Sequence, residues 1–191
     1  MIHKISIKYF AVFAIIFSGF ALCAKDKAPV QIKRVLIINA PLSKAWQVLG
    51  PEFADAYKWA SSLKHSQASD QTSFNGSTCT ERGCYIKGMG KTKEKLLIYS
   101  ENEHTISYHV YEGMPKMVKY ATNTWTLTDL GNGKTKVEIN LVMKTGGMMG
   151  SMMKGMMRKK MSKLATEVIE EFTYYVENGT PHARKLKSLN N

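Results

Sequence analysis

Arg82 and Glu94 are the two charged residues of this chain whose positions could support chemistry. The sequence places them on neighbouring strands of a predicted sheet, and Glu94 has the same parity as Leu96 and Ile98. If both side chains point inward, they could orient the head group of a ligand or act as an acid and a base. If they point outward, they form an exposed salt bridge between strands, and the sequence leaves both interpretations open.

Methionine is the second residue type with chemical meaning. Seven of the 12 methionines fall between Met148 and Met161. Four of these lie on a helix face rotated by about a third of a turn from the stripe that would pack on the core. Their thioether side chains fill irregular spaces with little strain, as the lining of a ligand cavity requires. Together with inward aromatic residues they give a predicted ligand site of Trp59, Tyr108, Trp125, Met143, Met149, Met153 and Met156.

Ordinary core packing is the alternative for the same aromatic and methionine residues. Methionine pairs could also hold Cu(I), which prefers soft sulfur ligands. The clustered methionines lack the neighbouring His, Cys or acidic residues of a tight metal site, so we predict no metal and no cofactor. The sequence has no Ser-His-Asp order and no paired carboxylates, so it offers no catalytic candidates beyond Arg82 and Glu94.

A strong positive charge limits the partners. Lys and Arg total 27 against 15 Asp and Glu, which gives a formal charge of +12. The charge is mostly scattered lysine, and no stretch interleaves arginine with aromatic rings, so we predict no nucleic-acid partner. Lys154, Arg158 and Lys159 lie beside the clustered methionines, and this combination could dock on an anionic membrane surface. The length fits one domain, and we expect a monomer.

The N-terminal sequence has the order of a secretory signal peptide. Lys4 and Lys8 precede a run of 14 apolar residues from Tyr9 to Leu22, and small and polar residues follow. That run is shorter than the ~20 residues of a membrane span. We predict that residues 1–24 are removed, that residues 25–29 form a linker, and that the protein is exported to the periplasm or secreted. Lipidation at Cys23 fits less well, because Leu22 stands where a small residue is needed.

Export permits a disulfide between Cys79 and Cys84. On one straight strand these residues would be about 16 Å apart, which is beyond the reach of a disulfide. A turn or bulge at residues 80–83 would be needed to join them, and Gly83 could provide it. The sequence therefore leaves two thiols and one disulfide as alternatives.

The pattern of apolar residues predicts one strand, two short helices, a series of strands and one long helix. The first strand covers Val30–Asn39, and the short helices cover Leu42–Leu49 and Glu52–Ala60. A strand and a loop are expected within residues 61–75. Five segments with a period of two follow: Thr78–Ile86, Lys91–Ser100, Thr105–Glu112, Met117–Leu130 and Lys134–Thr145.

The long helix is predicted to start after Gly146-Gly147 and to end near Asn178-Gly179, where glycine suits a C-cap. Residues 30–182 thus form the folded domain, and residues 183–191 are expected to be a flexible basic tail. The stripe of the helix that faces the core is predicted to consist of Met157, Met161, Leu164, Ala165, Val168, Phe172 and Tyr175.

This order of elements predicts an α+β fold. A curved antiparallel sheet of six to seven strands would wrap on the long C-terminal helix, with two short helices after the first strand. Because a single helix cannot fill the concave face of such a sheet, we expect a hollow between them.

Several segments are similar to those of one known family. They are Ile37–Pro41 leading into Ala45–Leu49, Trp59, Arg82 through Glu94–Leu96 to Tyr108, Thr135–Glu138 and Tyr174–His182. In order and spacing they resemble the START-like SRPBCC superfamily, which has the helix-grip fold of the birch-pollen allergen and includes polyketide cyclase/dehydrase-like and lipid-transport members. The resemblance covers about Val30–Lys185. It implies a hydrophobic ligand cavity but does not fix one chemistry.

We therefore expect a protein that binds and carries a hydrophobic small molecule, such as a lipid or a polyketide-like compound, without covalent chemistry. The first alternative is a cyclase, dehydratase or hydrolase that uses Arg82 and Glu94 in the same cavity. The second is a module that docks on membranes or proteins through its basic, methionine-rich helix.

Overall fold

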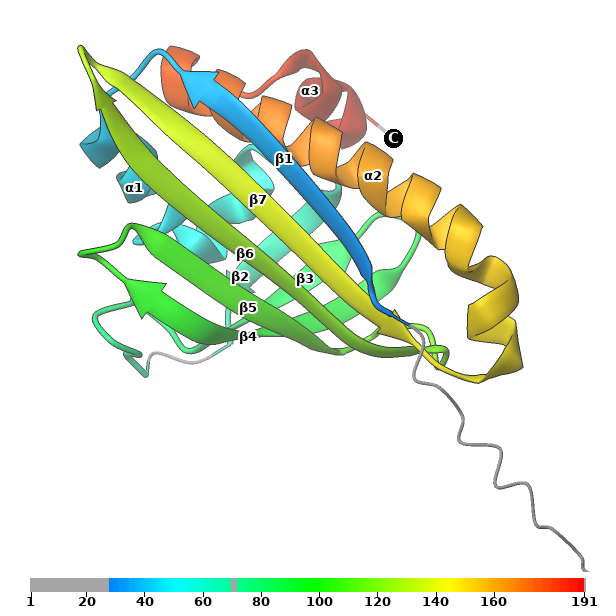
Figure 1. Cartoon of the computed structure of the whole chain (residues 1–191). Coiled ribbons are helices and arrows are strands. Elements are labelled where there is room, and N and C mark those ends of the chain that lie inside the picture. Colours follow the sequence, from blue (N-terminus) through cyan, green and yellow to red (C-terminus); the bar gives the residue numbers. More distant parts are fainter. Residues whose placement is uncertain (1–27, 70–71, 191) are drawn as a thin grey trace, which may run out of the picture.

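The computed structural model describes residues 28–69 and 72–190. The predicted signal peptide, with Cys23, lies outside the described residues. Seven strands form one antiparallel sheet in the order β1-β7-β6-β5-β4-β3-β2, and the long helix α2 runs along the sheet beside β1 (Figure 1). The predicted α+β helix-grip fold is confirmed. None of the helices within these residues is long and apolar enough to span a membrane.

The strands follow the segments with a period of two. The predicted turn between the last two strands is formed by Gly131, Asn132 and Gly133, all of which have positive φ. The strands are β1 (Val30–Ile38), β2 (Leu63–Ala68), β3 (Glu81–Ile86), β4 (Gly90–Ser100), β5 (Thr105–Glu112), β6 (Val118–Gly131) and β7 (Lys134–Thr145).

The helices begin and end close to the predicted residues. Pro41 precedes α1 (Leu42–Leu49), and a 3₁₀ helix, η1 (Phe53–Lys58), takes the place of the second short helix. The long helix α2 spans Gly147–Asn178. It ends at Gly179, whose left-handed backbone (φ 71°) lets its N–H donate to the carbonyl of Tyr175, as a glycine C-cap does.

The core lies between the inner face of the sheet and the C-terminal half of α2. Trp59, Trp125 and Phe172 pack edge to face there, with ring centroids 5.3–6.2 Å apart. The residues of α2 buried in this core are Ala165, Ile169, Phe172 and Val176, along with Glu171. The core stripe is therefore rotated from the prediction, which included Ala165 and Phe172 but missed Ile169 and Val176.

Residues 183–189 form a helix, α3 (Ala183–Leu189), where the sequence predicted a flexible tail. Arg184 donates to Glu171 on α2 (2.8 Å), and the buried Lys185 donates to the carbonyl of Leu63 (2.7 Å). The carboxylate of Glu171, which is buried, also accepts hydrogen bonds from the backbone N–H and the hydroxyl of Ser61. The basic residues of this segment thus have specific partners that hold α3 on the domain, and the flexible-tail prediction is wrong for residues 183–189.

Cys79 and Cys84 are both buried, and no disulfide joins them. Cys84 lies within β3, opposite Ser66 on one side and Thr92 on the other. Because β3 pairs with β4 without a register shift from Glu81 to Ile86, the chain has no turn near residues 80–83 that could bring the two sulfurs together. The sequence allowed either two thiols or one disulfide at Cys79 and Cys84, and the structure contains the two thiols.

Candidate functional site

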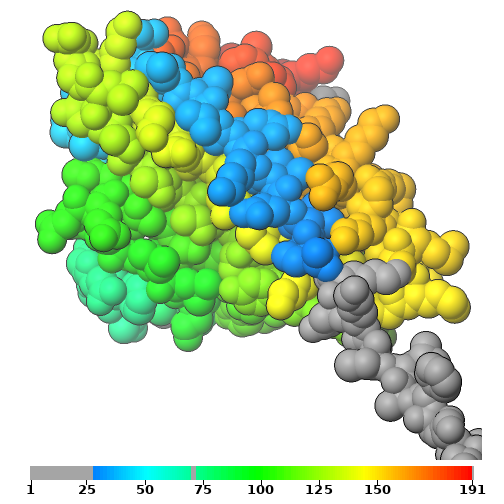
Figure 2. Space-filling model, viewed as in Figure 1, coloured from blue at the N-terminus to red at the C-terminus, as the bar shows by residue number. Residues whose placement is uncertain are grey.

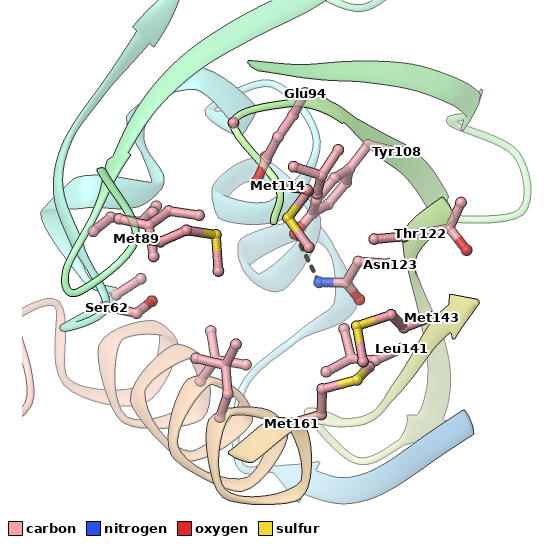
Figure 3. A pocket seen from close by; sticks show the side chains of 18 of the residues that line it. Ser62, Met89, Glu94, Tyr108, Met114, Thr122, Asn123, Leu141, Met143 and Met161 are labelled. Atoms are coloured by element: carbon pink, nitrogen blue, oxygen red, sulfur yellow. Dashed lines mark hydrogen bonds between the residues drawn. The ribbon is translucent and has the colours of Figure 1, made fainter. Parts of the chain in front are cut away.

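A cavity of about 610 Å³ lies between the concave face of the sheet and the N-terminal half of α2 (Figure 3). Its wall is built by β2 to β7 on one side and by α1, η1 and α2 on the others. Between Gly150 and Ala165 no residue of α2 is buried, and these turns border the space between the helix and the sheet. The volume is in the range of ordinary small-molecule sites, which is about 300–1,000 Å³.

Six of the seven predicted ligand-site residues lie on the wall of this cavity. They are Trp59, Tyr108, Trp125, Met143, Met153 and Met156. The prediction does not hold for Met149, which is 64% exposed and does not line the cavity. At about 100° per residue Met149 lies within about 20° of Met156, so its position along the helix separates it from the wall: it lies about two turns nearer the start of α2, before the first methionine of this helix that lines the cavity, Met153.

Eight of the twelve methionines line this one cavity. Sequence reasoning missed Met89 and Met114, because they lie in connections between strands, where no periodic pattern reveals a face. It also missed Met117, although this residue begins the predicted strand Met117–Leu130 and has the same parity as Ala121 and Trp125. Met157 and Met161 were assigned to the core stripe; they pack against the core and also line the cavity. Figure 3 shows Met89 and Met114 across the cavity from Met161, so methionines surround the space from several elements.

Arg82 and Glu94 point inward and form a buried ion pair. Arg82 Nε lies 2.6 Å from Glu94 Oε2, and each side chain is only 6% exposed. Arg82 also donates to the carbonyl of Phe53, and its guanidinium lies over the rings of Phe53 and Tyr108, 4.0 and 4.9 Å from their centroids. The sequence allowed either inward side chains or an exposed salt bridge. In the structure both side chains point inward, and both residues line the cavity.

Arg82 keeps its positive charge inside the protein. Burial disfavours the charge on Arg82, but the attraction of Glu94 outweighs it, so the pKa of Arg82 is raised above its ordinary value. Burial raises the pKa of the Tyr108 hydroxyl, which therefore stays protonated. Burial also raises the pKa of the Cys84 thiol to about 12, so this cysteine is a poor nucleophile at neutral pH.

Tyr108 and Asn123 form a second polar pair beside the ion pair. They are opposite each other in the register of β5 and β6, and Asn123 Nδ2 donates to the Tyr108 hydroxyl oxygen at 2.7 Å (Figure 3). Because Glu94 is opposite Val110, two residues along β5 from Tyr108, the four polar side chains follow one another across the sheet. We call Arg82, Glu94, Tyr108 and Asn123 the polar row.

The polar row can anchor a polar group of a ligand, while the rest of the wall is apolar. Within residues 28–69 and 72–190 there is no group of three or more His, Cys, Asp or Glu side chains that could hold a metal ion. The wall offers hydrogen-bonding groups and a neutralised ion pair to a ligand, together with flexible thioethers that can adapt to its shape.

Comparison with protein families gives one match. The model of the family described as polyketide cyclase / dehydrase and lipid transport matches residues 29–168, which is most of the chain. Among the curated proteins, no relative matches the chain.

Several solved structures have the same fold at low sequence identity. A START superfamily protein from Mycobacterium smegmatis aligns with a TM-score of 0.56 at 13% identity, covering 78% of this chain and 96% of that one. Truncated norcoclaurine synthase from Thalictrum flavum aligns with a TM-score of 0.59 at 13% identity, covering 80% and 97%. A protein from Nitrosospira multiformis aligns with a TM-score of 0.58 at 16% identity, covering 78% and 97%. At these identities the likeness is one of fold.

Proposed function

The chain belongs to the polyketide cyclase/dehydrase and lipid transport family, within the START-like SRPBCC superfamily, and from this we propose that it binds and carries a lipid or a polyketide-like molecule outside the cytoplasm. The observation that carries the proposal is the cavity of about 610 Å³ with eight methionines in its wall. Burial of a hydrocarbon ligand there removes apolar surface from water on both sides, at about 25 cal/mol for each Å².

The lining suits a ligand of variable shape. Leu141, Leu164 and Val168 provide an apolar wall, and the methionines provide side chains with several rotatable bonds. Since a water-sized group occupies about 30 Å³, the cavity has room for roughly 20 non-hydrogen atoms. That is the size of one lipid chain or of a small polycyclic molecule.

A titration with the neutral fluorophore N-phenyl-1-naphthylamine tests whether the cavity binds apolar molecules. We expect saturation at one molecule per chain. Ala121→Trp should abolish it, because Ala121 lies on the cavity wall and the larger side chain would fill the space. The matched control is Thr128→Trp, at an exposed position of the same strand. Equal binding by both variants would contradict a ligand site in this cavity.

Docking on an anionic membrane offers a route for ligand exchange. Four exposed methionines lie at the start of α2: Met148, Met149, Met152 and Met156, with exposed fractions of 83, 64, 81 and 46%. We call them the methionine ridge. Its turns of α2, coloured yellow in Figure 2, project at one edge of the molecule. Lys159 and Lys163 follow on the same face, so apolar and basic side chains meet near the cavity, as membrane-surface helices require.

The N-terminal sequence supports a location outside the cytoplasm. Its basic start, its apolar run of 14 residues and its small residues near position 24 are those of a secretory signal. Intact-mass measurement of the protein from the exported fraction tests this. A chain that starts near residue 25 supports export, and a chain that keeps residues 1–24 contradicts it.

Catalysis in the same cavity is the alternative function. The observation that favours it is the buried pair of Arg82 and Glu94 on the cavity wall, which could serve as polar groups of a cyclase, dehydratase or hydrolase. Each of the two charges is already held by the other at 2.6 Å, which suits a fixed anchor better than a proton shuttle. Turnover of a bound ligand that Glu94→Gln abolishes would favour the enzyme.

A further inference from the structure

Asn123 is the member of the polar row with an unused hydrogen-bonding atom. The residue is only 9% exposed, and its Nδ2 donates to Tyr108. Its carbonyl oxygen Oδ1 is buried, and none of the described residues donates to it. A buried carbonyl without a donor destabilises a fold, whereas a leucine of similar size would carry no such penalty.

The amide is on the wall of the cavity. Asn123 is opposite Leu141 in the register of β6 and β7, and Figure 3 shows its side chain between Tyr108 and the side chains of Leu141 and Met143. The Met143 side chain is unbranched and adapts its shape easily, so a ligand group can reach the amide from the cavity. The missing donor can thus come from a ligand.

The charge of the polar row selects among ligand groups. Arg82 and Glu94 neutralise each other, so the row has no net charge to offer. A carboxylate beside it would bring a second buried anion close to Glu94 and would face the lone pairs of Asn123 Oδ1. An ammonium group would bring a second cation close to Arg82. An uncharged group that donates a hydrogen bond avoids both penalties.

Tyr108 supplies the matching donor. Its hydroxyl oxygen accepts from Asn123 Nδ2, and a hydroxyl group that accepts there can still donate its own proton to a ligand. Burial raises the pKa of this hydroxyl, so the proton stays in place. A ligand hydroxyl can donate to Asn123 and accept from Tyr108 at the same time, which neither an ether nor a carboxylate does.

We propose that the natural ligand is an uncharged, largely hydrocarbon molecule with a hydroxyl group, and that this hydroxyl donates to Asn123 Oδ1 and accepts from Tyr108. The inference rests on the proposed function, since it names the ligand class of the same cavity. The apolar body of the ligand lies among the methionines, and its polar end lies at the polar row. Charged fatty acids and pure hydrocarbons are the classes that the site disfavours.

Displacement of N-phenyl-1-naphthylamine by three compounds of similar length tests the proposal. Dodecan-1-ol has the hydroxyl, its isomer 1-methoxyundecane keeps the oxygen but has no donor, and dodecanoate has the charge. With the wild-type protein we expect the alcohol to bind about tenfold more tightly than either of the others, since the ether and the carboxylate both leave Asn123 Oδ1 without a donor. A ratio of alcohol to ether within twofold would overturn the proposal.

The variant Asn123→Leu tests whether Asn123 causes the preference for the alcohol over the ether. Asn123→Leu should bring the ratio of alcohol to ether affinity close to one. Met153→Leu, a volume-conserving change elsewhere on the cavity wall, should leave the ratio at about ten. A tenfold ratio that persists in a folded Asn123→Leu protein would overturn the role of Asn123. The wild-type comparison needs no variant, so the ligand class remains testable if Asn123→Leu does not fold.

The outcomes also separate this inference from the function on which it rests. If neither the fluorophore nor any of the three compounds binds, the cavity is not a ligand site, and both are wrong. If all three compounds displace the fluorophore equally well, the cavity binds hydrophobic ligands, and only the hydroxyl preference is wrong.

Discussion

Arg82 Nε lies 2.6 Å from Glu94 Oε2, and the two side chains form a buried ion pair on the wall of the ligand cavity. Each residue therefore depends on the other, because a single charge left in this position would have no compensating partner. Arg82 and Glu94 are opposite each other in the register of β3 and β4, so the ion pair also holds the polar end of the cavity in place on the sheet.

Breaking this ion pair should cost stability. We expect Arg82→Met or Glu94→Leu alone to lower the free energy of unfolding by about 3–5 kcal/mol, since each leaves one uncompensated buried charge. The double variant should recover much of that loss. Urea denaturation of the three proteins measures this. A loss below about 1 kcal/mol in each single variant, as for an exposed pair, would show that the pair is not buried in solution.

Glu171 should matter far more for stability than its neighbour Glu170, although both bind Arg184. Glu171 is buried and accepts from Ser61 and Arg184, whereas the side chain of Glu170 is 44% exposed. We expect Glu171→Ala to cost about 3 kcal/mol because it leaves buried donors unpaired, and Glu170→Ala to cost less than about 1 kcal/mol. Thermal unfolding of the two variants is the measurement. Similar losses would contradict the packing of α3 described above.

The fold was largely predictable from the sequence, because the strands alternate apolar and polar residues and the helices start and end at Pro and Gly. Within β4 the alternation changes, since a register shift between Leu96 and Ile98 turns Ile98 outward. Glu94 comes before that shift, so its shared parity with Leu96 correctly predicted that its side chain points inward. The helix α3 was missed because its basic residues look like a solvated tail. Their partner Glu171 lies 13 residues before Arg184.

The candidate site was only partly predictable. The period of two correctly predicted that residues on regular strands, such as Tyr108, Trp125 and Met143, face the cavity. Met89 and Met114 did not, because the connections between strands have no periodicity. The boundary between cavity and core along α2 was also hidden, since it depends on where the helix leaves the sheet, and both faces carry apolar residues.

Cys84 gives the protein a specific dependence on alkaline pH. Burial raises the pKa of its thiol from 9.0 to about 12. Between these values the unfolded chain has lost the proton that the folded chain keeps, so stability falls as the pH rises, by up to about 1.4 kcal/mol per pH unit. Below pH 9 this group has no effect.

The matched variant for this effect is Cys84→Ala, which removes the thiol and leaves the other titrating groups. From pH 8 to pH 11 we expect the wild-type protein to lose about 2–3 kcal/mol more unfolding free energy than the variant does. Urea denaturation across this pH range provides the values. Parallel curves for the two proteins would mean that Cys84 is exposed or already ionised.

Membrane docking should depend on the methionine ridge. Met149 and Met152 are exposed and do not line the cavity, so Met149→Ser/Met152→Ser should weaken binding to vesicles of phosphatidylglycerol and phosphatidylcholine about tenfold while leaving ligand affinity unchanged. Higher salt should weaken binding of the wild-type protein too, because the lysines act through screened charge.

Two exposed leucines of α3 provide the control for docking. Leu186 and Leu189 are 52 and 61% exposed and lie away from the ridge in sequence, so Leu186→Ser/Leu189→Ser should float with vesicles as the wild-type protein does. Equal loss in both double variants would point to a general effect of apolar surface, and no loss in either would exclude docking through α2.

Native mass spectrometry of the protein purified from its own cells tests most directly whether the cavity holds a hydrophobic ligand. We predict a complex with one small molecule per chain, which organic solvent extracts and which is absent from Ala121→Trp. By the argument from Asn123, the extracted molecule should be neutral and contain a hydroxyl group. A wild-type protein that is always free of any ligand, and that takes up none when incubated with a lipid extract, would show that the cavity holds no such ligand.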